Sequence, residues 1–173
     1  EKISAVVSGT LIFGFGTTLA GLLVTIFLAR FIVERVLFIE ARLQDEAVTG
    51  LYLASATILT IVIGQVFQLV LQGLHRFDRF LLLANLSTVS FSLGSIALVM
   101  LGYGVVAILW WNLATWLIVC AASYIAAKRA LPEFRFTLNI GSETFRLVAS
   151  YGLSLMAYQL FGNVLLLFER GWI

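Results

Sequence analysis

Gln72-Gly73-Leu74-His75-Arg76-Phe77-Asp78-Arg79-Phe80 is the stretch that decides the fold, because it is a short basic connector between two long uncharged segments. Residues 47–74 before it and residues 80–127 after it contain no Asp, Glu, Lys or Arg. A helix of about 20 apolar residues crosses a bilayer core about 30 Å thick, so both segments are long enough to span a membrane. The composition agrees, since 61% of the 173 residues are hydrophobic and 12% are charged. We therefore expect an all-α, polytopic transmembrane helix bundle.

Five membrane spans are expected on working outward from the connector. Residues 80–127 are too long for one helix, and Leu101-Gly102-Tyr103-Gly104 supplies turn residues near their middle, because glycine accepts positive φ freely. Ser142 is suited to cap a last helix, with Glu143 at its positive end. The expected spans are residues 3–29, 48–74, 80–100, 105–127 and 147–168.

Lysine and arginine residues predict the orientation, because cytoplasmic loops are enriched in them. With five spans, alternate connections share one side of the membrane. One side collects Lys2, Arg76, Arg79, Lys128, Arg129, Arg135 and Arg146. The other side collects Arg30, Arg35, Arg42 and Arg170. Seven basic residues against four predict that the first side, with the N-terminal end, is cytoplasmic.

The chain does not begin with Met and stops just after a crossing, so we expect a fragment of a longer protein.

Polar residues recur along several spans, and a polar side chain in hydrocarbon is costly unless it meets protein or water. In residues 80–100, steps of three and four join Asn85, Thr88, Ser92 and Ser95. A comparable line in residues 48–74 joins Thr57, Thr60, Gly64, Gln68 and Gln72, with Gln65 beside it. Two interpretations stay open: these residues hold helices together, or they line a hydrated cavity. The candidate cavity residues are Gln68, Gln72, Asn85, Thr88, Ser92, Asn112, Gln159 and Asn163.

Basic residues on the predicted cytoplasmic side suit an anionic headgroup or pyrophosphate, at about 1 kcal/mol per residue near an anionic surface. Alternatively, they only set the topology. The net charge of +2 is too small to indicate a nucleic-acid partner, and the lipid bilayer is the expected one. The candidate rim residues are Arg76, Arg79, Lys128, Arg129 and Arg146.

Residues suited to catalysis are scarce. No Asp, Glu, Lys or Arg lies inside an expected span, and His75 and Cys120 are the single histidine and cysteine. His75 fits an interfacial position, and Cys120 a small apolar one. A membrane-embedded glycosyl or acyl transferase would need an acid or histidine cluster near the surface, which only Glu34, Glu40, Asp45 and Glu46 approach. We expect no catalytic residue, metal site or cofactor, and hence no enzyme.

Four features in this order resemble a known family. They are Leu71-Gln72-Gly73-Leu74-His75-Arg76-Phe77, Leu101-Gly102-Tyr103-Gly104-Val105, a basic linker containing Pro132, and Tyr151-Gly152-Leu153-Ser154 opening a span. The order resembles the polysaccharide biosynthesis (O-antigen and exopolysaccharide) flippases of the multidrug, oligosaccharidyl-lipid and polysaccharide exporter superfamily. The resemblance implies two helical bundles of a dozen or more helices, of which this chain would contain helices three to seven. Residues 1–127 would belong to the first bundle, residues 128–146 would be an amphipathic cytoplasmic linker, and residues 147–173 would begin the second bundle.

By the same resemblance, the protein would move undecaprenyl-linked oligosaccharide from the cytoplasmic to the outer leaflet of a bacterial or archaeal inner membrane by alternating access. Its partners would be the lipid-linked glycan and polysaccharide polymerase or assembly proteins. A drug or cation antiporter of the same superfamily is an alternative, although it would favour a carboxylate inside the membrane. A non-transporting scaffold, whose polar residues only join helices, is another.

Overall fold

The fold was analysed in a computed structural model that describes residues 2–132, 146–150, 152–154 and 157. These residues form helices and turns, with no strand among them. The long helices are α1 (Lys2–Phe31), α2 (Gln44–Gly73), α3 (Phe77–Met100) and α4 (Val105–Ala130), each long and apolar enough to cross a membrane. Short helices join α1 to α2, namely a π-helix at Ile32–Val36 and a 3-10 helix at Ala41–Leu43. The predicted all-α transmembrane bundle is therefore confirmed.

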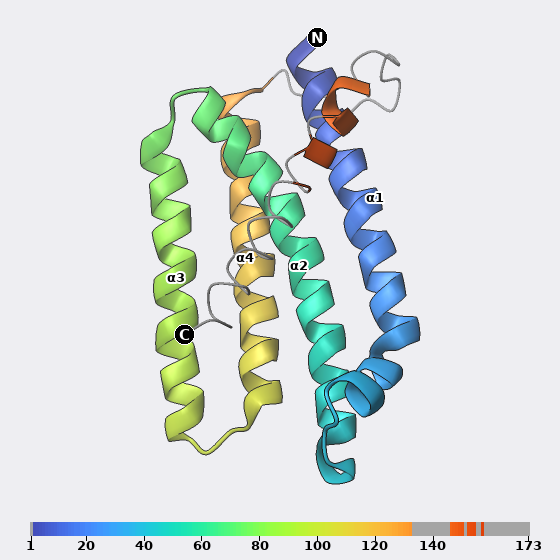
Figure 1. The fold of residues 1–173 in the computed structure, drawn as a ribbon. Coiled ribbons are helices and arrows are strands. Elements are labelled where there is room, and N and C mark those ends of the chain that lie inside the picture. The colour runs from blue at the N-terminus through green and yellow to red at the C-terminus, as the bar shows by residue number, and fades with distance from the viewer. Residues whose placement is uncertain (1, 133–145, 151, 155–156, 158–173) are drawn as a thin grey trace, which may run out of the picture. The chain divides into compact units, whose positions relative to one another are not determined.

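The chain divides into two compact units, Gly14–Phe134 and a second formed by Glu1–Phe13 with Arg135–Ile173. In the larger unit α2, α3 and α4 lie side by side, and α4 packs against both of the others (Figure 1). Successive helices run in opposite directions because the connections between them are short. The C-terminal end of α2 and the N-terminal end of α3 therefore lie at the same end of the bundle as the C-terminal end of α4.

In the smaller unit, the described residues include helical positions 146–150 and 152–154. Gly152 lies against the ring of Phe13, whose Cε1 would be 2.6 Å from a Cβ at position 152. Any larger residue at this position would have to displace that ring. The remainder of the expected fifth span and most of the linker at residues 128–146 fall outside the described residues.

Charged residues extend the helices beyond the uncharged segments. Helix α2 begins at Gln44, so that Asp45 and Glu46 occupy its first turn, and α4 runs to Ala130 with Lys128 and Arg129 in its last turn. Acids near a helix N-terminus and bases near a C-terminus are favoured by the helix dipole. The helices are thus longer than their uncharged cores because the terminal charges stabilise additional turns.

The two turns that flank α3 share one hydrogen-bond pattern. After α2, His75 N donates to Gln72 O and Arg76 N donates to Leu71 O, at 2.9 and 2.8 Å. After α3, Gly102 N and Tyr103 N make the equivalent bonds to Val99 O and Leu98 O, both at 3.0 Å. Both are Schellman motifs, which need a left-handed residue just beyond the helix. Gly102 takes this conformation at φ 80° without steric cost, and His75 adopts it at φ 56° with a side chain attached.

Helix α4 approaches α2 closely at a glycine. A Cβ at Gly64 would lie 3.5 Å from Cys120 Cα, so the two backbones are near neighbours here. One turn further along, Gln68 Nε2 donates to Ser123 Oγ at 3.4 Å, and the rings of Phe67 and Tyr124 meet edge to face at 5.3 Å. Small residues that permit close approach, with hydrogen bonds between helices, are typical of membrane helix packing.

Helix α4 meets α3 through one large side chain. Trp111 Nε1 donates to the Ser90 carbonyl oxygen at 3.1 Å, and its indole occupies the space that a Cβ at Gly94 would need. Leu83 and Ser87 are the buried residues of α3. The packing face of α3 therefore follows the line of Leu83, Ser87 and Gly94.

Candidate functional site

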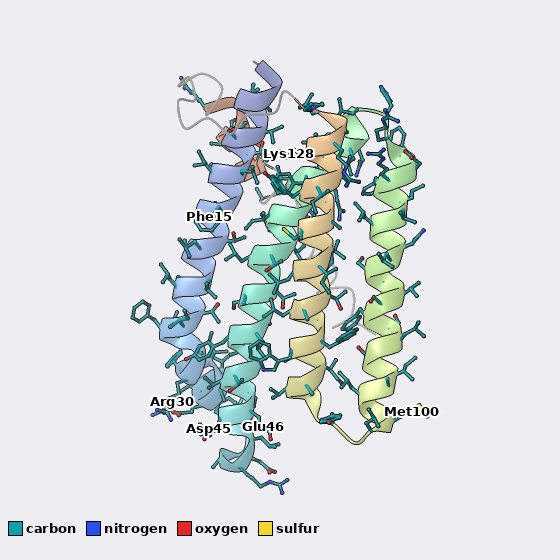
Figure 2. All side chains as sticks on the ribbon, turned by 180° about the vertical axis from the view of Figure 1, so that it is seen from behind. Phe15, Arg30, Asp45, Glu46, Met100 and Lys128 are labelled. Carbon is teal, nitrogen blue, oxygen red and sulfur yellow. The ribbon has the colours of Figure 1, made fainter. Side chains whose placement is uncertain are left out.

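One end of the larger unit carries most of its unpaired positive charge. Arg76 lies in the turn after α2, Arg79 follows in the first turn of α3, and Lys128 and Arg129 close α4. Figure 2 shows Lys128 at the end of the bundle opposite Met100. We call these four residues the basic end. Asp78 is the acidic residue among the described residues at this end, so four bases stand against one acid.

The side chains of the basic end are accessible. Arg76, Lys128 and Arg129 are exposed, and Arg79 is half-buried. Lys128 Nζ lies 5.8 Å from the centre of the Tyr124 ring, which is within range of a cation–π contact. None of the four forms an ion pair within the described residues. Arg146 of the predicted rim is also exposed, and it belongs to the other unit.

The opposite end has a different charge pattern. Its described bases are Arg30, Arg35 and Arg42, and its acids are Glu34, Glu40, Asp45 and Glu46. Arg30 Nε lies 3.8 Å from Glu34 Oε1, and Arg30 Nη2 lies 4.0 Å from Asp45 Oδ1. Part of the positive charge at this end is therefore paired with nearby carboxylates. Figure 2 shows Arg30, Asp45 and Glu46 together at this end. An anion approaching the larger unit would therefore be attracted mainly to the basic end.

The polar line of α2 is buried. Thr57, Thr60, Gly64 and Gln68 all have little exposure, and Gln68 bonds to Ser123 of α4. The hydroxyls of Thr57 and Thr60 donate to the carbonyls of Leu53 and Ala56 within the helix. We call these four residues the inner polar line. Its members contact helix α4 or their own backbone, which is the behaviour of polar residues that join helices.

The polar line of α3 is exposed. Asn85, Thr88 and Ser92, which we call the outer polar face, all have accessible side chains. This face and the packing face of α3 are centred about 150° apart around a helix of 3.6 residues per turn. Thr88 Oγ1 donates to Ala84 O at 3.1 Å, whereas Asn85 and Ser92 have no hydrogen-bond partner within the described residues. An unpaired amide is costly in hydrocarbon, so this face suits contact with water, a polar ligand or further protein.

Of the other four candidate cavity residues, two lie within the described part of the chain. Gln72 and Asn112 are half-buried, and Gln159 and Asn163 lie outside the described residues. Gln65, which lies beside the inner polar line and is not among the candidate cavity residues, is exposed and without a hydrogen-bond partner among the described residues. Its proximity to Gln68 and Gln72, three amides within about two turns of an uncharged segment, was the signal that could have included it.

Two further hydroxyl groups, one in α3 and one in α4, are buried. Thr115 Oγ1 and Ser95 Oγ are buried without a hydrogen-bond partner in the described part of the chain. Ser95 was expected to continue the line of Asn85, Thr88 and Ser92, but its hydroxyl turns inward.

No group of three or more His, Cys, Asp and Glu residues suited to a metal ion occurs within the described ranges.

Comparison with known proteins supplies one match. The model of a family described as polysaccharide biosynthesis protein matches residues 2–166. No curated protein and no solved structure matches the chain. The match covers the helices α1 to α4 and both turns that flank α3.

Proposed function

Because the chain belongs to this family of polysaccharide biosynthesis proteins, we propose that it moves a lipid-linked oligosaccharide across the membrane. In this proposal an undecaprenyl-linked glycan passes from the cytoplasmic to the outer leaflet of an inner membrane by alternating access. The sugar travels in a hydrated cavity and the lipid tail stays in the bilayer. The protein makes and breaks no covalent bond.

The outer polar face of α3 is the observation that carries the proposal. Helix α3 has 24 residues and is about 36 Å long at 1.5 Å per residue, enough to cross the hydrocarbon core. Asn85, Thr88 and Ser92 lie within this length and expose amide and hydroxyl groups without any fixed charge. Such groups exchange hydrogen bonds with sugar hydroxyls about as readily as with water, so a glycan can pass without being trapped.

The basic end supplies a complementary site for the charged part of the substrate. A pyrophosphate bears negative charge that arginine and lysine side chains bind through charge-assisted hydrogen bonds. Arg76 and Arg79 lie where α3 begins, about two turns before Asn85. In the proposal, a lipid-linked glycan held by its pyrophosphate at this end extends its sugar along α3 toward the depth of Asn85. In the proposal this end is cytoplasmic, as the excess of basic residues predicts.

The experiment uses the full-length gene. The gene is deleted in its host, and the amount of lipid-linked glycan is measured on each leaflet after complementation with the natural protein or with variants. One variant combines Arg76→Ala and Arg79→Ala, and a second combines Asn85→Ala and Ser92→Ala. At about 1 kcal/mol per basic residue, the first pair should weaken recruitment of the anionic lipid roughly thirtyfold.

A matched control changes the same residue type at the opposite end. Arg35→Ala with Arg42→Ala removes the same amount of charge and should leave the leaflet distribution unchanged. Deletion should cause glycan to accumulate on the cytoplasmic leaflet, and both test variants should fail to restore export at normal protein levels. An unchanged glycan distribution on deletion, with increased drug sensitivity, would contradict the proposal and favour a drug exporter.

A further inference from the structure

The connection between α1 and α2 is formed by two short helices and is held by backbone hydrogen bonds. The elbow, as we call this connection together with the last residue of α1, comprises residues 31–43 and contains the π-helix Ile32–Val36 and the 3-10 helix Ala41–Leu43. Leu37 N donates to Ile32 O at 2.9 Å, and Ile39 N donates to Val33 O at 3.2 Å. The Gln44 side chain closes the segment by donating from Nε2 to Ile39 O at 3.0 Å. Hydrogen bonds thus hold the elbow in one defined conformation.

Phe38 occupies an unusual position in this element. Its φ is 49°, in the left-handed region where glycine or asparagine is ordinarily found and where a bulky aromatic residue is an outlier. The side chain is also 80% exposed. Packing within the described residues does not explain a strained phenylalanine with an outward ring. A strained residue is a reason to look for a role of its side chain.

Other apolar side chains share this exposure. Val33 is completely buried in the π-helix, which contacts α2, whereas Phe31, Val36 and Leu37 are more than half exposed, like Phe38. The charges of the elbow balance, since Glu34 and Glu40 are matched by Arg35 and Arg42. The elbow therefore combines a large apolar surface with no net charge.

The lengths of the flanking helices place the elbow at the membrane surface. Helices α1 and α2 have 30 residues each, which corresponds to about 45 Å at 1.5 Å per residue. The hydrocarbon core is about 30 Å thick, and the bilayer with its headgroups is about 40–45 Å. The ends of both helices therefore reach headgroup depth. Segments that combine apolar side chains with charged ones settle at the boundary between headgroups and acyl chains.

We propose that the elbow is an interfacial anchor whose partner is the lipid bilayer, with the side chains of Leu37 and Phe38 inserted at the boundary between headgroups and acyl chains. The left-handed backbone at Phe38 directs its ring away from the protein and into this layer. Because the elbow has no net charge, insertion depends on apolar contact and proceeds in zwitterionic lipid. The basic end, by contrast, requires anionic groups. The anchor would hold one end of α1 and α2 at constant depth.

The test measures depth by spin labelling of the full-length protein in phosphatidylcholine vesicles. Phe38→Cys and Leu37→Cys are labelled separately in a Cys120→Ala background, and each label's accessibility to oxygen and to a water-soluble nickel complex is recorded. The Leu37 site reports depth with the Phe38 ring still in place, so the test does not depend on tolerance of the Phe38 substitution. Asp45→Cys is the control, because the Asp45 side chain is 97% exposed at the start of α2.

The expected result is greater access of oxygen than of nickel at positions 37 and 38, with the reverse at position 45. The result at 37 and 38 should not change when anionic lipid is added to the vesicles. High nickel accessibility at both positions would overturn the proposal, since the elbow would then lie in water. Exclusion of both reagents would also overturn it, because the side chains would be packed against another part of the protein or a second copy.

Discussion

The inner polar line of α2 and the outer polar face of α3 have the same pattern in the sequence and opposite surroundings in the structure. Both place small polar or amide side chains at steps of three and four in the uncharged part of a helix. Thr57, Thr60 and Gln68 are buried, with Gln68 bonded to α4, whereas Asn85 and Ser92 are exposed without a partner in the described residues. A polar stripe in a membrane helix is therefore not by itself evidence for a cavity.

The difference has a physical origin in α4. This helix presents Cys120 and Ser123 to α2, so the polar groups of the inner line meet backbone and a hydroxyl. Toward α3 it places Trp111, whose indole lies where a side chain at position 94 would be, so only glycine leaves room for it. Helix α3 must therefore turn its glycine side toward α4, which leaves Asn85, Thr88 and Ser92 on the far side.

Cysteine accessibility should give the largest contrast between the two stripes. In a Cys120→Ala background, Asn85→Cys and Ser92→Cys should react with a small water-soluble thiol reagent, because the proposed cavity is hydrated. Thr57→Cys and Thr60→Cys should remain unreactive in the folded protein, since both positions are buried. Labelling in intact vesicles, scored by mass spectrometry, measures this. Unreactive cysteines at both 85 and 92 would show that the outer polar face does not meet water.

Substitution at the packing face of α3 should have the next largest effect. Gly94→Ala introduces a methyl group where the Trp111 indole lies, and overpacking of this kind costs about 1–3 kcal/mol. Ser92→Ala, two residues away on the outer polar face, should change the unfolding free energy by less than about 0.5 kcal/mol. Unfolding of the purified protein in mixed detergent micelles compares the two. Equal stability of both variants would contradict the assignment of the two faces.

The hydrogen bond between Gln68 and Ser123 should make a smaller contribution. A double-mutant cycle of Gln68→Ala and Ser123→Ala should show a coupling energy of about 0.6 kcal/mol, the average for such bonds between membrane helices. Asn85→Ala serves as the control and should leave stability nearly unchanged, since its amide has no partner among the described residues. Additive effects of the two substitutions would indicate that the bond does not join α2 to α4.

Gly64→Ala should have the smallest effect. The added Cβ would lie 3.5 Å from Cys120 Cα and from its Cβ, which is an ordinary van der Waals separation. Alanine also favours the helix over glycine, so the expected change in unfolding free energy is about 0.5 kcal/mol or less. The same unfolding measurement as for Gly94→Ala tests it. A loss as large as that of Gly94→Ala would contradict this expectation, since α2 and α4 would then pack as tightly at Gly64 as α3 and α4 do at Gly94.

Some features of the site could be predicted because they depend on local properties. The uncharged segments predicted an all-α membrane bundle. Four short features in order, namely the two turn motifs, the linker with Pro132 and the segment from Tyr151 to Ser154, predicted the family whose model matches residues 2–166. The alternation of short connections predicted that Arg76, Arg79, Lys128 and Arg129 share one end of the bundle, which the structure shows. Their role as a headgroup or pyrophosphate rim stays a prediction. The inward position of Ser95 and the exposure of Gln65 were not predicted, because each depends on how far the helix is rotated about its axis. The cavity role of the candidate residues stays a prediction.

The sequence by itself determined that this protein crosses the membrane, since long segments without charge cannot remain in water and their backbone groups must bond within helices. It also determined where charge gathers, because the charged residues of α1, α2, α3 and α4 all lie near the ends of these helices. Only the tertiary structure decided which polar stripe is covered. Gly64 and Gln68 of α2 are covered by Cys120 and Ser123 of α4, more than 50 positions later in the chain, and the rotation of α3 depends on the space that Trp111 occupies beside Gly94. Periodicity along one helix carries no information about such distant contacts.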